Sequence, residues 1–119
     1  MDERPPLWVG HIVLTVAYLD DSYAFWQSIG LRPVDQSQNV AILELRGGTH
    51  LILVPGTPTP GDAPFDLMVD DVDAVHDAWE AKGLRVSAIR RDNIHDSFDL
   101  RDPDGYIVQV SNSHVVGPV

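Results

Sequence analysis

The chain has 119 residues and a mass of 13.1 kDa, a length that suits one compact domain. Hydrophobic residues make up 44% and charged residues 22%, which excludes disordered, collagen-like and coiled-coil chains. The 18 Asp and Glu residues outnumber the 8 Lys and Arg residues, and the net charge of −10 would repel nucleic acids and anionic membrane surfaces. The absence of cysteine excludes disulfides and thiolate chemistry. No apolar stretch is long enough to cross a membrane, and the acidic start is unlike a secretory signal, so we expect a cytoplasmic protein.

The first half of the chain, taken in order, predicts one helix among four strands. We expect strands at 8–16, 31–34, 39–45 and 49–54, and a helix at 21–29. Asp20, Asp21 and Ser22 are candidate N-cap residues for that helix, and Gly30 suits the left-handed position that follows a helix. A segment rich in proline and glycine, 56–63, then predicts a linker.

The second half repeats this order of elements. We expect strands at 65–69, 84–87, 97–100 and 106–111, and a helix at 72–82. Gly83 closes the second helix as Gly30 closes the first, and a turn is expected at 102–105. Residues 114–119 form a C-terminal tail.

Five residues of the first half recur 53 positions later, which indicates an internal duplication. Val16, Trp26, Gly30, Leu31 and Arg32 become Val69, Trp79, Gly83, Leu84 and Arg85. The sequence therefore predicts one domain, 1–119, built from two β-α-β-β-β modules at about 7–55 and 64–113.

Three segments carry a resemblance to a known family: Gly-His-Ile-Val-Leu-Thr-Val at 10–16, Val-Asp-Asp-Val-Asp-Ala at 69–74, and Asp-Pro-Asp-Gly-Tyr-Ile-Val-Gln-Val at 102–110. Together with the repeat, they resemble the vicinal oxygen chelate superfamily, which includes glyoxalase I, extradiol dioxygenases and bleomycin-resistance proteins. The resemblance implies an α+β fold in which two βαβββ modules form a cupped mixed sheet. It also implies a divalent metal on the concave faces, activating a substrate with two adjacent oxygens, although some members bind a ligand without metal.

The four metal positions that the resemblance implies are matched unevenly. His11 stands at the first position, and His50 is the only ligand-competent side chain in the fourth strand. Alignment of the two modules places Ile52, not His50, opposite Gln109. Pro64 occupies the third position, and Gln109 replaces the usual Glu at the fourth. Two imidazoles and an amide suit zinc, iron, nickel or manganese better than magnesium or calcium, if a metal binds at all.

The three remaining histidines have different expectations. His95, beside Asp96, is a candidate catalytic acid–base residue or replacement ligand, the alternative being a solvated loop histidine. His76 is expected to face solvent from the second helix. His114 is expected to cover a sheet edge.

These observations leave several functions open. The favoured one is a metal-dependent lyase or dioxygenase of the glyoxalase type, acting on a small molecule with adjacent oxygens. The alternative is a metal-free protein that binds a small molecule, as bleomycin-resistance proteins do, and a weaker one is a non-catalytic partner module. Because unpaired strand edges invite association, we also expect a homodimer.

Overall fold

The computed structural model describes residues 3–119, and its contacts divide the chain into two compact units. The first contains the chain up to Thr59 together with Val115–Val119, and the second contains Pro60–His114. Each unit has the predicted β-α-β-β-β order, so the α+β fold with two βαβββ modules is confirmed. No helix within residues 3–119 combines the length and apolar character needed to span a membrane.

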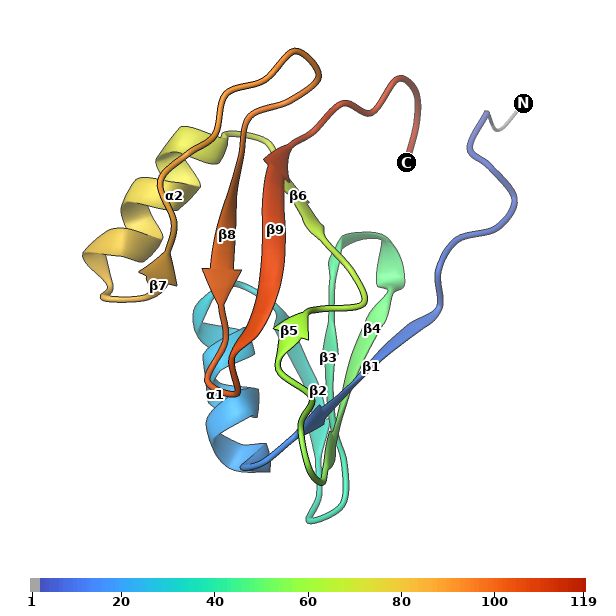
Figure 1. Ribbon diagram of the computed structural model, residues 1–119. Helices are drawn as coiled ribbons and strands as arrows, with labels where there is room; N and C mark the ends of the chain where they lie inside the picture. The colour runs from blue at the N-terminus through green and yellow to red at the C-terminus, as the bar shows by residue number, and fades with distance from the viewer. Residues whose placement is uncertain (1–2) are drawn as a thin grey trace. The chain divides into compact units, whose positions relative to one another are not determined.

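The first unit is a four-stranded mixed sheet with one helix on it (Figure 1). Its elements are β1 (His11–Val16), α1 (Leu19–Ser28), β2 (Arg32–Gln36), β3 (Ala41–Glu44), a short 3-10 turn (Arg46–Gly48) and β4 (His50–Pro55). The strand order is β1-β4-β3-β2, in which β1 runs parallel to β4 and the other pairs are antiparallel. The helix α1 packs on β3 and β4.

The second unit repeats this plan with one additional short strand. Its elements are β5 (Gly61–Asp62), β6 (Leu67–Val69), α2 (Val72–Ala81), β7 (Arg85–Val86), β8 (Ser97–Arg101) and β9 (Tyr106–Asn112). The order is β5-β9-β8-β7, with β6 also parallel to β9, and α2 packs on β7 and β9. The strand β5 lies inside the segment predicted as a linker and pairs with the start of β9.

The two helices end in the same way, as the two glycines predict. Gly30 has φ 120° and Gly83 has φ 81°, a backbone region that costs glycine little and other residues more. In each case the amide after the glycine donates to the carbonyl of a core tryptophan, Trp26 or Trp79, at 3.1 Å. These are Schellman endings, which satisfy carbonyls at the end of the helix.

The helix starts differ from each other. The predicted side-chain cap of α1 is wrong, because the helix begins after Tyr18, which makes no side-chain cap, and Asp20 and Asp21 fall in its first turn. Their charges still suit the helix dipole there. In α2 the equivalent residue, Asp71, accepts a hydrogen bond from the amide of Ala74 at 3.0 Å.

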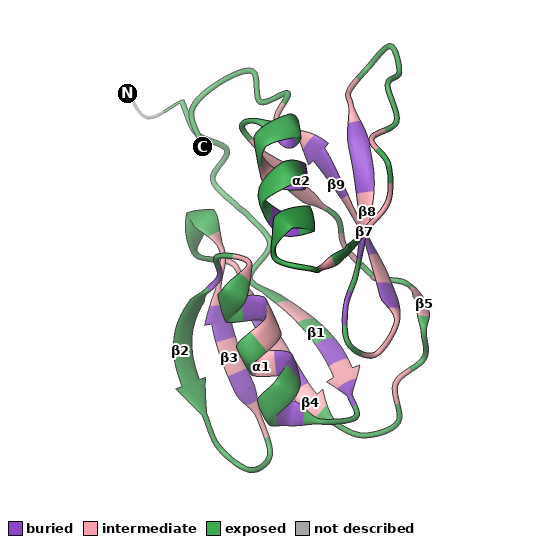
Figure 2. Ribbon diagram, turned by 90° about the vertical axis from the view of Figure 1, so that its left-hand side faces the viewer, coloured by how far each residue is buried: buried purple, intermediate pink, exposed green. Residues whose placement is uncertain are grey.

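Each sheet has one face covered by its helix and one face that we call the open face (Figure 2). In β4 the helix-facing Leu51 and Leu53 are fully buried, whereas the alternate residues are half-buried. In β9, Val108 and Val110 are fully buried and Gln109 between them is half-buried. This period-two alternation decides which side chains a ligand could reach.

The strand registers match between the modules. Val16 pairs with Pro55 in the first unit, and Val69 pairs with Asn112 in the second. Equivalent positions therefore lie 53 residues apart in the first part of each module and 57 apart in its last strands. The structure thus supports the alignment that makes Ile52 the counterpart of Gln109.

Candidate functional site

A polar row crosses the open face of the first unit at the start of β1. His11 lies opposite His50, which lies opposite Glu44, which lies opposite Arg32, so each of the four strands contributes one residue. The two imidazole rings are stacked, with centroids 5.9 Å apart and an interplanar angle of 22°. We call these four residues the histidine row.

The carboxylate of Glu44 links the middle of the histidine row. Its Oε1 lies 3.0 Å from Nε2 of His50, and its Oε2 forms an ion pair with Arg32. The Glu44 side chain is only 18% exposed, so its two partners compensate a charge that has lost most of its water. Sequence reasoning missed Glu44, although its alternation with Ile42 along the third strand was a usable signal.

Next to the histidine row, the open face is apolar. Val13 is 53% exposed, and Ile42 and Ile52, which pair across β3 and β4, are half-buried. Val13 lies opposite Ile52 on β1. A small molecule resting here would contact aliphatic side chains and would have imidazole groups at one end.

The donors of the first unit do not fit a metal centre as they are arranged. Stacked rings direct their in-plane lone pairs side by side, whereas a shared ion requires them to converge at about 2.1 Å. Nε2 of His50 is engaged with Glu44, and Glu44 is engaged with Arg32. Within residues 3–119, no group of three or more His, Asp or Glu side chains is placed to hold an ion.

Gln109 occupies the open face of the second unit. It pairs with Asp99 of β8, and its side-chain amide makes no hydrogen bond with the residues that the structure describes. The Asp99 carboxylate is held by two hydrogen bonds from Arg90, at 2.9 and 3.1 Å. The neighbour of Gln109 is therefore a carboxylate whose charge is already compensated.

His95 lies in the loop before β8, away from Gln109. The backbone amide of the next residue, Asp96, donates to Oδ1 of Asn112 at 2.7 Å, so His95 lies beside the end of β9, beyond Gln109 along that strand. Its ring stacks on that of His114, with centroids 5.8 Å apart and an interplanar angle of 21°. Nδ1 of His95 is buried and has no hydrogen-bond partner in the described part of the chain.

The prediction that His76 faces solvent is wrong. His76 is 9% exposed, its Nε2 lies 2.9 Å from the carbonyl of Ser87, and its ring meets Phe98 edge to face. Its Nδ1 lies 3.1 Å from Asp77, and that contact raises the pKa of His76 above its ordinary value. The residue follows Val72 by four positions, which places it on the buried face of the helix.

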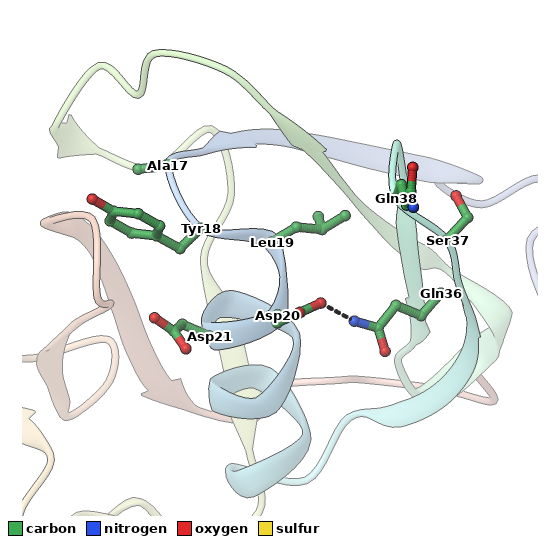
Figure 3. Close-up of a pocket in the computed structure, with 8 residues that line it drawn as sticks. All are labelled: Ala17, Tyr18, Leu19, Asp20, Asp21, Gln36, Ser37 and Gln38. Carbon is green, nitrogen blue, oxygen red and sulfur yellow. Dashed lines mark hydrogen bonds between the residues drawn. The ribbon is translucent and has the colours of Figure 1, made fainter.

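A hollow in the first unit lies elsewhere, away from the histidine row (Figure 3). It has a volume of about 710 Å³ and is open to solvent, and Figure 3 shows the hydrogen bond from Gln36 to Asp20 across it. Ala17 and Tyr18 line it, just beyond the end of β1. The six residues of β1, about 20 Å of extended chain, separate it from His11, so it is not the predicted site.

Comparisons with known proteins agree on one family. The family model described as Glyoxalase/Bleomycin resistance protein/Dioxygenase superfamily matches residues 8–110. The search of curated proteins gives no significant match. A lactoylglutathione lyase from Agrobacterium tumefaciens has a similar structure, with a TM-score of 0.79 and 24% identity over 92% of this chain and 96% of that one.

Other similar structures have different described roles. TnmS3, an antibiotic binding protein from Streptomyces sp. CB03234, has a TM-score of 0.77 and 18% identity, over 92% of this chain and 98% of its own. The oxidase ChaP-H2 has a TM-score of 0.75 and 18% identity, over 92% and 95%. These likenesses establish the fold, and together with the match over 8–110 they show that the chain belongs to the glyoxalase/bleomycin resistance protein/dioxygenase superfamily.

Proposed function

We propose that this protein binds a small, partly apolar molecule on the open face of its first module and does so without a metal ion. The observation that carries the proposal is the arrangement of the histidine row. Glu44 already engages His50 and Arg32, so its negative charge, which a metal cation would need, is compensated by side chains of the protein. The histidine row then supplies hydrogen-bonding groups rather than an ion site.

The chemistry of the face suggests what the ligand looks like. Val13, Ile42 and Ile52 offer a flat aliphatic surface, which favours an aromatic or similarly flat apolar body. Beyond its stacking on His50, the His11 ring makes no hydrogen bond with residues 3–119. Its nitrogens can therefore donate to or accept from a hydroxyl or carbonyl group at the ligand's edge.

The metal-dependent enzyme remains the rival prediction. It would use His11, His50 and Gln109 as ligands of a divalent ion, with His95 as an acid–base residue. It requires His50 to release Glu44, or Glu44 to release Arg32, before donors can converge. A probe with two adjacent oxygens distinguishes the two functions. A metal-free binding face would bind it directly, whereas a metal-dependent enzyme would bind it only by chelation to the ion.

The experiment is a catechol titration of EDTA-treated protein, followed by methyl resonances in ¹H–¹³C spectra. We expect saturable shifts at Val13 and Ile52, and about tenfold weaker binding in His11→Ala, the effect of losing one hydrogen bond to a polar ligand. His114→Ala, the same change in the second unit, should leave binding unaltered. Adding Zn²⁺ should not tighten it.

A different pattern would refute the proposal. If catechol binds only after Zn²⁺, Ni²⁺ or Fe²⁺ is supplied, or if the reconstituted protein converts the hemithioacetal of methylglyoxal and glutathione, the protein is a metal-dependent enzyme. Equal weakening by His11→Ala and His114→Ala would also refute it, because the site would then not be the histidine row.

A further inference from the structure

The duplication allows the histidine row to be compared with its counterpart in the second module. Arg32 and Glu44 pair across β2 and β3, and their equivalents, Arg85 and Arg101, pair across β7 and β8. The register is the same, but the carboxylate of the first module is replaced by a second guanidinium. An ion pair in one module therefore becomes a pair of like charges in the other.

Arg32 is paired with the carboxylate of Glu44, but Arg85 and Arg101 have no such carboxylate partner within the described residues. Arg85 donates from Nη2 to the backbone carbonyl of Asp102 at 2.5 Å, which satisfies one N–H group but supplies no counter-charge. The Arg101 side chain makes no hydrogen bond or ion pair with the residues from 3 to 119. Like charges directly opposite each other in a sheet are destabilising. The arginine pair is not a consequence of a generally basic chain, because the sequence has 8 basic and 18 acidic residues.

Both arginines line a hollow of about 450 Å³ within the second unit. This volume lies in the range of small-molecule sites. Leu84, Val86 and Ile107 supply apolar lining. The hollow therefore combines a doubly positive edge with an aliphatic wall.

Two carboxylates also line the hollow, and neither neutralises the arginine pair. Asp99 is held by two hydrogen bonds from Arg90, so its charge is already matched. Glu80 on α2 forms no ion pair with either guanidinium within the described residues. Within residues 3–119, neither Arg85 nor Arg101 is paired with a carboxylate.

We propose that Arg85 and Arg101 bind the carboxylate of a small organic acid, at the position where the first module has its own Glu44. Guanidinium groups match a planar carboxylate through paired N–H donors. The apolar wall accommodates the body of the acid, which an inorganic anion lacks. This site lies on the second module and is independent of the small-molecule face proposed for the first.

The experiment is a titration of the full chain with benzoate, followed by the backbone amides of Val86 and Ile107 and the arginine side-chain N–H signals. Benzamide, which has the same ring without the charge, and inorganic phosphate are titrated in parallel. We expect saturable binding of benzoate, at least about tenfold tighter than that of either control, the worth of one charge-assisted hydrogen bond.

Matched variants test the residues. Arg85→Gln and Arg101→Gln should each weaken benzoate binding about tenfold or more. Arg101→Glu should abolish it by rebuilding the ion pair of the first module. Arg32→Gln, which removes a charge from the equivalent position of the first module, should leave it unchanged.

The proposal is overturned if benzoate gives no saturable shift in the wild-type chain, or if benzamide or phosphate binds as tightly. It is also overturned if Arg32→Gln weakens benzoate as much as Arg85→Gln does, since a general charge effect would then suffice. Retained amide dispersion in the two glutamine variants shows that they are folded. Catechol binding to the first module should survive in both, which separates failure of this site from failure of the other.

Discussion

Substitution of Gly56 tests how closely β1 and the end of β4 are packed. A Cβ built on Gly56 would stand 2.8 Å from Cγ2 of Thr15, whereas carbon atoms in contact prefer about 3.5–4.0 Å. The amide of Gly56 donates to the carbonyl of Val16 at 2.9 Å, so the backbone is not free to move away. We expect Gly56→Ala to destabilise the protein by about 1–3 kcal/mol, the usual cost of overpacking.

The chain offers an internal control at Gly10. A Cβ there would meet nothing within 4 Å, and, as at Gly56, its φ lies outside the left-handed region. Gly10→Ala should therefore be neutral or stabilise by about 0.4–1 kcal/mol, because alanine restricts the unfolded chain. Thr15→Ser removes the clashing methyl and keeps the hydroxyl, so it should relieve most of the Gly56→Ala penalty.

The assay is urea unfolding of the four proteins of the Thr15/Gly56 cycle and of Gly10→Ala. We expect a favourable coupling of about 0.5–3 kcal/mol between Thr15→Ser and Gly56→Ala, with unchanged m-values. Equal midpoints for Gly56→Ala and Gly10→Ala, or no relief by Thr15→Ser, would refute the close contact as the cause.

Three further predictions concern pH and assembly. Asp77 raises the pKa of His76, so the stability from this contact is present below pH 6.5 and is lost as pH rises through the raised pKa. The difference in urea midpoint between wild type and Asp77→Asn should therefore shrink over that range. A difference that stays constant with pH would contradict this. Burial raises the pKa of Asp102, which is 0% exposed. The wild-type protein should therefore lose stability relative to Asp102→Asn as pH rises above 3.8. Parallel curves of urea midpoint against pH for the two proteins would exclude this. The predicted homodimer should show twice the 13.1 kDa chain mass in light scattering, and a monomer at all concentrations would contradict it.

The local parts of the fold were predictable because their signals are local. Gly30 and Gly83 mark helix ends by a backbone requirement that no neighbour alters. The duplicated Trp26 and Trp79 fix which face of each helix is buried. The strand β5 was missed because it is only two residues long, and a proline- and glycine-rich segment gives no alternation to detect.

The candidate sites were predictable only in part, because they depend on cross-strand register. His11 and His50 were found as residue types, but their stacking depends on which residues of β1 and β4 lie opposite each other. Glu44 and Arg101 were missed for the same reason, because the role of a charged residue in a strand depends on which residue lies opposite it in the sheet. His76 was misjudged because it was placed off the apolar stripe of its helix, although it follows Val72 by four positions and therefore shares its face.

The alternation along β4 and β9 also bears on how this chain can evolve. Buried residues that hold the fold together alternate with half-buried residues of the open face along the same strands, so one position can be substituted while its neighbours keep the core intact. Because most core substitutions destabilise whereas exposed ones are tolerated, new specificities can arise on the open faces with little loss of stability. The exchange of a glutamate for an arginine between the two halves is a record of such divergence within one molecule.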